Sequence, residues 1–284
     1  MSTHPGTATQ SEKAKAFRAL HASGIFVIPN PWDVGTARIL ASLGFAALAT
    51  TSAGYAFSIG RRDGAITRDD ALAHARAIVG ASDLPVSADL ENCFGDAPET
   101  VAETIRLAAA TGLVGGSVED ATGDPDRPIY EHALAVERVA AAVAAARALP
   151  FSFTLTARAE NFLHGRRDLD DTIRRLQAFA AAGADVLYAP GLPDLDAVRK
   201  VCAAVAPKPV NVLANGRVAD FTVASLAEAG VRRISVGSAL ACAAFGAFLR
   251  GAREIQATGG FTFGAEAASY AEVNGFMAGK PASS

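Results

Sequence analysis

Short apolar segments alternate with longer helical patterns along almost the whole chain. These segments begin near Ile25, Phe45, Pro85, Leu113, Phe151, Asp185, Lys208 and Arg233. Several intervening helices end at glycine, as in Leu43-Gly44 and Thr111-Gly112, where a left-handed helix end carries no steric cost. Eight short strands, each joined to the next by a helix, predict an α/β fold, a parallel (β/α)8 barrel of the TIM type with an extra C-terminal helix.

An open doubly wound sheet is the alternative arrangement of the same elements. Its dinucleotide-binding form carries Gly-x-Gly-x-x-Gly after the first strand, where this chain has Pro29-Asn30-Pro31. We therefore favour the barrel. The chain has 284 residues, 50% of them hydrophobic, which is enough for one large core. We expect a disordered tail over residues 1–11 and a single barrel domain over residues 12–284, which includes a C-terminal helical segment at 265–284.

The composition narrows the class of partner. The formal net charge is −3 and charges of both signs are scattered, which argues against nucleic acid or an anionic membrane as a partner. The longest apolar runs are interrupted by charges or glycine, so none predicts a membrane span. Residues 1–13 lack the apolar core of a secretion signal, and three scattered cysteines suit neither a disulfide framework nor a zinc site. We expect a cytoplasmic protein that acts on a small molecule.

Acidic side chains end two neighbouring predicted strands. Asp89 and Glu91 follow Val86, and Glu119-Asp120 follows the next strand. Carboxylates two residues apart on an extended chain point to the same side, and a hard divalent cation prefers several such oxygen ligands. The alternative is that these acids are solvated strand ends, and that Asp120 pairs with a helix or a lysine instead.

Active sites of such barrels lie at the carboxyl ends of the strands, so further polar residues are expected there. The candidates are Thr51, Ser52, Ala53, Gly54, Asp63, Arg158, Glu160, Asn161, Tyr188, Asn211, Asn215 and Ser238. Arg158 would hold a substrate carboxylate as a planar two-pronged donor, and its alternative role is a salt bridge to Glu91 or Glu160. The small Ser52-Ala53-Gly54 turn would let backbone N–H groups approach a second anionic group. Together these residues describe a site for a small acid with two anionic ends.

Residues 25–245 resemble the isocitrate lyase / phosphoenolpyruvate mutase superfamily in the order and spacing of these segments. The family's serine-glycine turn is similar to Ser52-Ala53-Gly54, with alanine in place of a glycine, and its downstream aspartate corresponds to Asp63. Its Asp-x-Asp-x-Gly-[Tyr/Phe]-Gly motif resembles residues 89–95, with Glu91 for the second aspartate and Cys93 for the first glycine. Its Glu-Asp and Ala-Arg segments correspond to residues 119–120 and 157–158.

The resemblance implies a set of roles. A Mg²⁺ (or Mn²⁺) ion would be held by Asp89, Glu91 and Glu119, with Asp63 acting through water. We expect catalytic roles for Arg158, Glu119 and Asp63. Substrate contacts would come from Thr51, Ser52, Ala53, Gly54, Arg158, Glu160 and Asn211. Members of the family are tetramers that exchange a C-terminal helix between subunits, and the segment after Gly264 would be that helix.

The loop after the fourth strand departs from the family pattern. Lyases of the family carry Lys-Lys-Cys-Gly-His or Lys-Arg-Cys-Gly-His there, and the cysteine is the catalytic acid. Residues 121–128 contain no Cys, Lys or His, and the lysines and asparagine of the mutase loop are absent too. Cleavage of isocitrate or methylisocitrate is therefore disfavoured, because the leaving carbanion would lack its proton donor.

We expect an enzyme that makes or breaks a C–C bond of a small 2-oxo or 2-hydroxy dicarboxylic acid through a metal-bound enolate, with oxaloacetate decarboxylation as the simplest example. One alternative is P–C bond chemistry on phosphonopyruvate. The other is a non-catalytic barrel that binds a 2-oxo acid, for which the altered motif and loop would be the reason.

Overall fold

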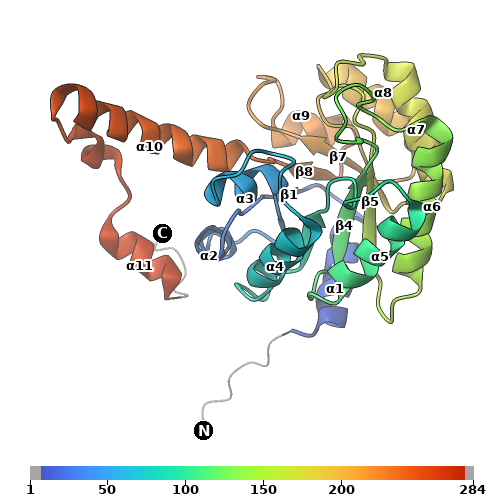
Figure 1. Cartoon of the computed structure of the whole chain (residues 1–284), viewed down its shortest axis with the longest axis horizontal. Coiled ribbons are helices and arrows are strands. Elements are labelled where there is room, and N and C mark those ends of the chain that lie inside the picture. The colour runs from blue at the N-terminus through green and yellow to red at the C-terminus, as the bar shows by residue number, and fades with distance from the viewer. Residues whose placement is uncertain (1–7, 279–284) are drawn as a thin grey trace, which may run out of the picture.

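The computed structural model describes residues 8–278 and confirms the predicted barrel (Figure 1). Parallel strands pair in the order β1-β8-β7-β6-β5-β4-β3-β2. Their bounds are β1 Phe26–Ile28, β2 Leu48–Ala49, β3 Val86–Asp89, β4 Gly115–Glu119, β5 Thr154–Arg158, β6 Val186–Tyr188, β7 Val210–Leu213 and β8 Arg233–Ser235. Each predicted strand is present.

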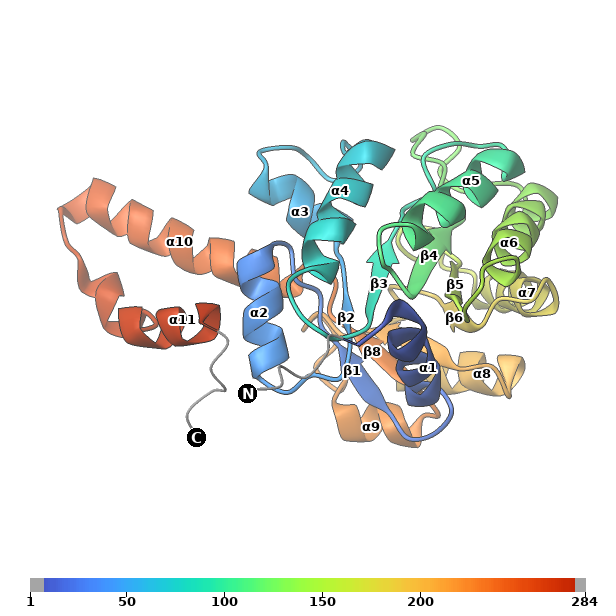
Figure 2. The same cartoon turned by 90° about the horizontal axis from the view of Figure 1, so that it is seen from below.

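Helices surround the strands (Figure 2). Their bounds are α1 Gln10–Leu20, α2 Val34–Ser42, α3 Ser52–Ser58, α4 Arg68–Val79, α5 Pro98–Ala109, α6 His132–Arg147, α7 Leu169–Ala181, α8 Leu195–Val205, α9 Val223–Glu228, α10 Ala239–Thr258, the 3-10 helix η1 Thr262–Glu266 and α11 Tyr270–Met277. Phe17 of α1 packs with Phe26, the first residue of β1, and with Val114, which precedes β4, at the amino-terminal end of the strands. α1 therefore covers that end, and the carboxyl end carries the opening.

The alternation of side chains along each strand separates two environments. Outward residues such as Leu155, Leu187 and Ile234 pack against the helices in large apolar clusters. The inward residues include Ser87, Ser117, Thr156 and Ser235, all of them buried. Barrels of this type are usually filled by bulky branched side chains, so small hydroxyl residues in this position leave space inside the barrel.

Asn30, which follows β1, closes the ring between the two ends of the sheet. Its Nδ2 donates to the Thr50 carbonyl after β2 at 3.0 Å. Its Oδ1 accepts from the amides of Val236 and Gly237 after β8 at 3.0 and 2.9 Å. The Pro29-Asn30-Pro31 segment is therefore a closure element of the barrel.

Two helices begin differently from the prediction. α1 starts at Gln10, because the Thr9 side chain accepts from the Glu12 amide while the Thr9 amide donates to the Glu12 carboxylate at 2.7 Å. Residues 10 and 11 therefore belong to α1, whereas the predicted tail over residues 1–7 lies outside the described residues. The segment after Thr51, predicted as a turn followed by a loop, begins the short helix α3, with the Thr51 side chain as its cap.

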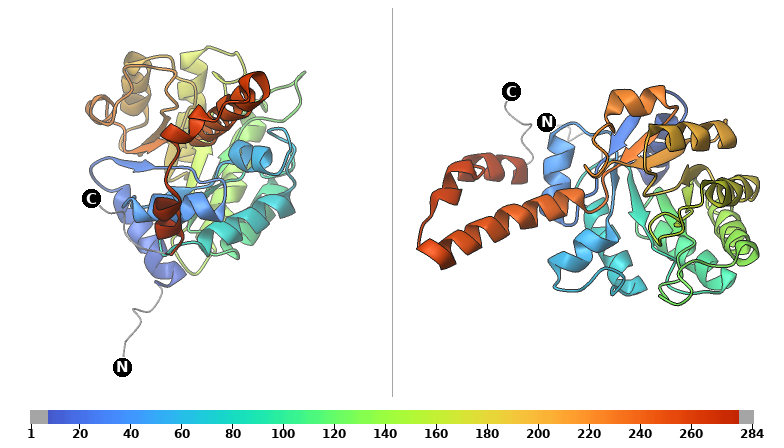
Figure 3. Two further views of the ribbon diagram at one scale, coloured as in Figure 1. Left: turned by 90° about the vertical axis from the view of Figure 1, so that its left-hand side faces the viewer. Right: turned by 90° about the horizontal axis from the view of Figure 1, so that it is seen from above.

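The C-terminal helices extend away from the barrel as an arm (Figure 3). α10 leads outward from β8, and α11 turns back to α2, where the Arg38 Nη1 donates to the Met277 carbonyl at 3.3 Å. Residues 279–284 of the predicted C-terminal segment lie outside the described residues. Within residues 8–278, no helix is long and apolar enough to cross a membrane.

Candidate active site

The carboxyl ends of the strands surround a cavity of about 1510 Å³. Glu119 and Arg158 are register partners at the last positions of β4 and β5, and Asp89 ends the neighbouring strand β3. All three line the cavity. The structure therefore brings together three side chains that the sequence places at strand ends.

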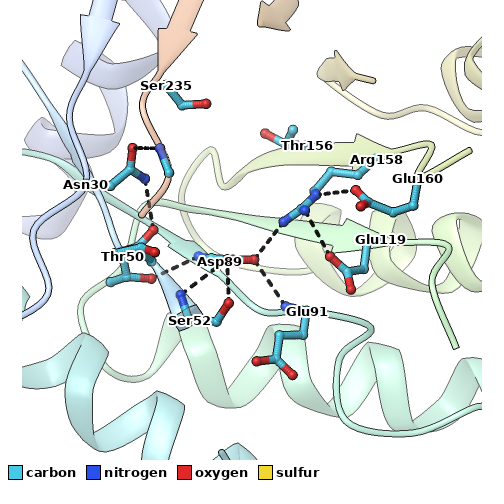
Figure 4. A network of polar contacts seen from close by, with 12 residues as sticks. Asn30, Thr50, Ser52, Asp89, Glu91, Glu119, Thr156, Arg158, Glu160 and Ser235 are labelled. Carbon is cyan, nitrogen blue, oxygen red and sulfur yellow. Dashed lines mark hydrogen bonds and ion pairs between the residues drawn. The ribbon is translucent and has the colours of Figure 1, made fainter. Parts of the chain in front are cut away.

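Arg158 lies at the centre of this group (Figure 4). Its Nη1 donates to Asp89 Oδ1 at 2.8 Å, its Nη2 lies 3.1 Å from Glu119 Oε2, and its Nε donates to Glu160 Oε1 at 2.8 Å. Burial alone would lower the pKa of Arg158, but the carboxylates of Glu160, Glu119 and Asp89 raise it above its usual range. Arg158 is thus a fixed cation whose three nitrogen atoms each face a carboxylate.

Ser52 supports Asp89 from the opposite side. Its Oγ and its amide both donate to Asp89 Oδ2, at 2.9 and 3.3 Å. The Asp89 amide in turn donates to Thr50 Oγ1 at 2.9 Å. Both oxygens of Asp89 are therefore engaged, one by Arg158 and the other by Ser52, and its carboxylate has a defined orientation.

The turn after Asp89 is held in an unusual backbone conformation. Glu91, Cys93 and Phe94 have φ values of 50°, 61° and 62°, a left-handed region that costs a non-glycine residue about 1–2 kcal/mol. Arg138 of α6 compensates, because its Nη1 donates to the carbonyls of residues 95 and 96 at 2.5 and 2.6 Å and its Nη2 to that of residue 92. Sequence reasoning does not identify Arg138, whose only signal is a cation in an alanine-rich helix.

Glu91 is the acid of the site whose hydrogen bonding is least complete. Its Oε1 is buried and has no hydrogen-bond partner among the described residues. Burial, followed by the Asp89 and Asp63 carboxylates, raises the pKa of Glu91 to about 7. This carboxyl group has an unused oxygen and shares its surroundings with other acids.

The pKa values of two further acids, Glu119 and Asp63, are also raised. Burial raises the pKa of Glu119 well above its usual range, although Arg158 opposes this effect. Asp63 lies in the loop after α3 on the cavity wall, and partial burial and the Asp89 carboxylate raise its pKa. Burial is thus the main cause of these raised pKa values, and the neighbouring carboxylates add to it.

The acids fit a divalent cation by chemistry. Among residues 8–278, no three acidic, His or Cys side chains already surround a common point. The reason is that Arg158 occupies oxygens of both Asp89 and Glu119. The crowded carboxylates and the unpartnered Glu91 Oε1 nevertheless form the donor set that a hard cation prefers. Cation binding would require Asp89 and Glu119 to exchange Arg158 for the ion.

Asp120 forms its hydrogen bonds within the wall of the barrel. Its Oδ2 accepts from Arg175 Nη1 of α7 at 2.9 Å, and its Oδ1 accepts from the Glu160 amide at 2.8 Å. It points away from Glu119 because successive residues of a strand face opposite sides. Asp120 therefore pairs with a helix, the alternative considered from the sequence. Through the Glu160 amide it also fixes the residue that holds Arg158 Nε.

The predicted anion-binding turn is the first turn of α3. The Gly54 amide donates to Thr51 Oγ1 at 3.2 Å, and the Ser52 amide is engaged with Asp89. Only the Ala53 amide has no acceptor within the described chain. A Cβ atom on Gly54 would lie 2.7 Å from Thr51 Cγ2 and 3.3 Å from the Ala241 Cβ, so glycine is required here by close packing.

Asn211 lies deeper in the cavity and is tied to a residue that sequence reasoning does not identify. Its Nδ2 donates to Ser235 Oγ at 2.9 Å, and its Oδ1 accepts from Arg233 Nε at 2.8 Å. Arg233 is buried, begins β8 and lines the cavity. Its only sequence signal is a basic residue at an inward position of an otherwise apolar strand.

The loop at residues 121–128 borders the cavity and folds back on itself. An antiparallel bridge joins Ala121 and Ile129, and the Thr122 amide donates to the Pro128 carbonyl at 3.0 Å. Thr122, Gly123 and Pro125 line the cavity. This loop therefore reaches the site and brings only small, uncharged side chains to it.

Comparisons with known proteins agree with this architecture. The family model for phosphoenolpyruvate phosphomutase matches residues 17–256. The 2-methylisocitrate lyase of Escherichia coli K12 is 30% identical over 227 residues, which cover 76% of this chain and 75% of that enzyme.

Solved structures show the same likeness. A Burkholderia cenocepacia J2315 protein, provisionally designated a lyase/mutase, is 60% identical, with a TM-score of 0.93 over 96% of this chain and 99% of that one. Oxaloacetate acetylhydrolase in complex with its product oxalate is 26% identical, with a TM-score of 0.84 over 94% of each chain.

Proposed function

Because the chain belongs to the isocitrate lyase / phosphoenolpyruvate mutase superfamily, we propose that it is a divalent-metal enzyme that makes or breaks a C–C bond of a small 2-oxo or 2-hydroxy dicarboxylic acid. The superfamily contains C–C lyases, hydrolases and phosphonomutases. One observation carries the proposal: Arg158 and the acids Asp89, Glu119 and Glu160 converge at the strand ends within one cavity.

Arg158 is the carboxylate-binding residue of the proposed reaction. Its Nη atoms are paired with Asp89 and Glu119, while Glu160 holds its Nε. With Asp89 and Glu119 holding a cation, both Nη atoms of Arg158 would be free to hold a substrate carboxylate, and Glu160 would keep the guanidinium oriented. The Ser52 hydroxyl and the free Ala53 amide would then contact the same end of the substrate.

Asp89, Glu91 and Glu119 would hold the Mg²⁺ or Mn²⁺ ion, and Asp63 would act through water. The cation would supply Lewis-acid stabilisation of the negative charge that develops on the 2-oxo group as the C–C bond breaks. Electrostatic pre-organisation is the main contribution of this chain, since its acids are already directed to one region of the cavity.

The loop at residues 121–128 limits the range of reactions that we propose. It lines the cavity without a Cys, Lys or His, so it offers no proton donor to a leaving carbanion. We therefore place the chain in a branch that lacks the lyase loop and does not cleave isocitrate-type substrates. The likeness to oxaloacetate acetylhydrolase supports an acid of the size of oxaloacetate.

The experiment is the release of pyruvate from oxaloacetate with Mg²⁺ or Mn²⁺. We expect metal-dependent turnover in the wild type, a loss of at least about 100-fold in Asp89→Ala, and little change in Asp126→Asn, which removes an exposed acid of the 121–128 loop. Turnover no faster than that of the free metal ion would contradict decarboxylation as the reaction.

P–C bond chemistry on phosphonopyruvate is the second candidate, supported by the match to the phosphoenolpyruvate phosphomutase model. Turnover of phosphonopyruvate but not of oxaloacetate would favour it. Metal-dependent binding without turnover across a panel of 2-oxo acids would instead favour a non-catalytic binding barrel.

The assembly is part of the same proposal. We treat the chain from Gln10, the start of α1, to residue 284 as one domain, and the protein as a cytoplasmic homotetramer in which the C-terminal helical segment is exchanged between subunits. The arm formed by α10, η1 and α11 supports this arrangement, because it extends from the barrel (Figure 3). The arm also carries exposed apolar side chains.

A further inference from the structure

The cavity continues below the acid cluster into the barrel. The inward residues Ser87, Ser117 and Ser235 line it, as does Arg233 at the start of β8. Serine fills much less space than the branched residues usual in a barrel interior, so ligands can reach this depth. The lower part of the cavity is therefore polar, and it contains a guanidinium group.

Arg233 is held by three neutral acceptors. Its Nε donates to Asn211 Oδ1 at 2.8 Å, its Nη2 to Thr156 Oγ1 at 2.9 Å, and its Nη1 contacts His21 Nε2 at 3.4 Å. The other ring nitrogen of His21 lies 2.8 Å from the Phe17 carbonyl. That nitrogen carries the proton, so Nε2 is free to accept from Arg233.

The charge of Arg233 is not matched by a carboxylate. Arg233 is 5% exposed and forms no ion pair with an acid among residues 8–278, whereas Arg158 and Arg175 each pair with acids. Burial and the nearby Arg158 lower the pKa of Arg233 to about 10, so it stays charged at neutral pH. A buried charge without a counter-charge is disfavoured. Arg138 also lacks an acid partner among these residues, but it donates to three backbone carbonyls and does not line the cavity, whereas Arg233 lines it.

The guanidinium also has unused donors. An arginine has five N–H groups, and the three contacts leave one on each Nη atom. Because Arg233 lines the cavity, these N–H groups are available to a ligand that enters it. Two parallel N–H groups of this kind match the two oxygens of a carboxylate.

Arg158 and Arg233 are joined by a row of strand partners. The register runs from Arg158 to Tyr188, then to Asn211 and to Arg233. The Arg158 guanidinium lies 5.2 Å from the centre of the Tyr188 ring. A short acid whose one end is held at Arg158 can therefore extend past Tyr188 toward Arg233.

We propose that Arg233, supported by Asn211, Thr156 and His21, binds the anionic group of the substrate that is remote from Arg158. This assignment rests on the proposed function for the identity of the ligand. It makes the substrate a linear acid with anionic groups at both ends, one near the metal ligands and one at the base of the cavity. Arg233 then selects dianionic over monoanionic 2-oxo acids.

Anion binding at Arg233 is tested by a measurement that does not require catalysis. Inorganic sulfate is titrated calorimetrically into the metal-free protein in chloride-free buffer, where carboxylates already occupy Arg158. We expect saturable binding to the wild type, at least tenfold weaker binding to Arg233→Gln, and affinity within twofold of wild type for Arg232→Gln, the exposed neighbouring arginine. Arg233→Met serves as a second variant should the glutamine variant not fold. Absence of saturable binding to the wild type, or equal affinity in the Arg233 variants, overturns the proposal.

The ligand is tested by kinetics. In Arg233→Met we expect the KM for oxaloacetate to rise at least tenfold with kcat within about threefold, while the affinity for oxalate in the presence of Mg²⁺ stays within twofold, since oxalate is too short to span both arginines. Loss of sulfate binding with an unchanged KM would mean that the site holds a free anion, and would overturn the substrate assignment. If the wild type turns over no 2-oxo or 2-hydroxy acid, the proposed function fails, while the sulfate titration still decides whether Arg233 binds anions.

Discussion

Glu91 shows how a single substitution in a motif changes the electrostatics of a site. It is longer than the aspartate of the family pattern, and its Oε1 remains buried without a partner among the described residues. Burial is the first cause of its raised pKa, and the neighbouring Asp89 and Asp63 carboxylates are the next. In the metal-free protein this residue therefore exchanges a proton near neutral pH.

This raised pKa predicts how stability depends on pH. The folded pKa of about 7 exceeds the usual 4.5, so between these values the folded state holds a proton that the unfolded chain releases. Stability from this group is present below pH 4.5 and is lost as the pH rises to 7. Between pH 5 and 7.5, we expect the free energy of unfolding of the wild type to fall by about 1–2 kcal/mol more than that of Glu91→Gln. Urea unfolding in EDTA measures the free energy of unfolding of each protein across this pH range, with the exposed Glu137→Gln as control. If the wild type and Glu91→Gln lose stability equally as the pH rises, the prediction is wrong.

A second residue prediction concerns the Asp120–Arg175 pair. Both side chains are buried, and removal of one partner leaves an uncompensated charge in the barrel wall. We expect Arg175→Met to lower the free energy of unfolding by about 3 kcal/mol. Arg174→Met, which removes the exposed neighbouring arginine, should cost less than about 1 kcal/mol. Equal midpoints of urea unfolding for the two variants would show that the buried pair does not stabilise the fold.

The sequence predicts some of these residues and not others for a physical reason. Asp89, Glu119 and Arg158 end strands, and their inward direction follows from the period of two along a strand. Arg138 and Arg233 act from a helix and from the start of a strand, and their roles depend on which carbonyls and acceptors the fold brings to them. No local pattern contains that information, so these two arginines are found only in the structure.

At the scale of the elements, periodicity predicts the strands and the longer helices, whereas α3 is not predicted. It has only seven residues, and its Ser-Ala-Gly start has the composition of a turn. Its cap and packing define it instead, since Thr51 Oγ1 accepts from the Gly54 amide at 3.2 Å. The start of α1 is also not predicted from the local sequence. The capping contacts between Thr9 and Glu12 set it.

The close packing of α3 leads to a prediction. A Cβ at Gly54 would meet Thr51 Cγ2 at 2.7 Å, and Thr51 cannot rotate away without losing its cap on α3. We expect Gly54→Ala to cost about 2–3 kcal/mol of stability, a typical cost of overpacking, and to displace Ser52 from Asp89. Ala53→Gly, which restores the family's glycine beside it, should cost less than about 1 kcal/mol. Thermal unfolding compares the two, and a Gly54→Ala variant as stable as Ala53→Gly would contradict the packing argument.

At the scale of the whole molecule, the barrel combines an apolar outer layer with a polar interior. Leu155 and Ile234 bind the strands to the helices, while Ser117 and Arg233 face the cavity. The apolar layer is what the sequence pattern shows most clearly, which is why the barrel could be predicted. The interior depends on whether each side chain of a short strand faces inward or outward. For Arg233 this decides whether it faces the helix layer or the cavity.

The arm carries the last prediction, which concerns assembly. Phe248 is 70% exposed, Phe261 69% and Tyr270 87%, and large apolar side chains exposed along one arm favour a protein interface there. We expect light scattering to give the wild type a mass of several chains of 29.0 kDa each. The double variant Phe248→Glu/Phe261→Glu should shift the mass toward that of one chain, because two charges would be buried in the interface. Val223→Glu, which places a charge at an equally apolar but isolated position on α9, should leave the assembly unchanged. A wild type with the mass of a single chain would refute the exchanged-helix arrangement and leave the arm as an extension of a monomeric barrel.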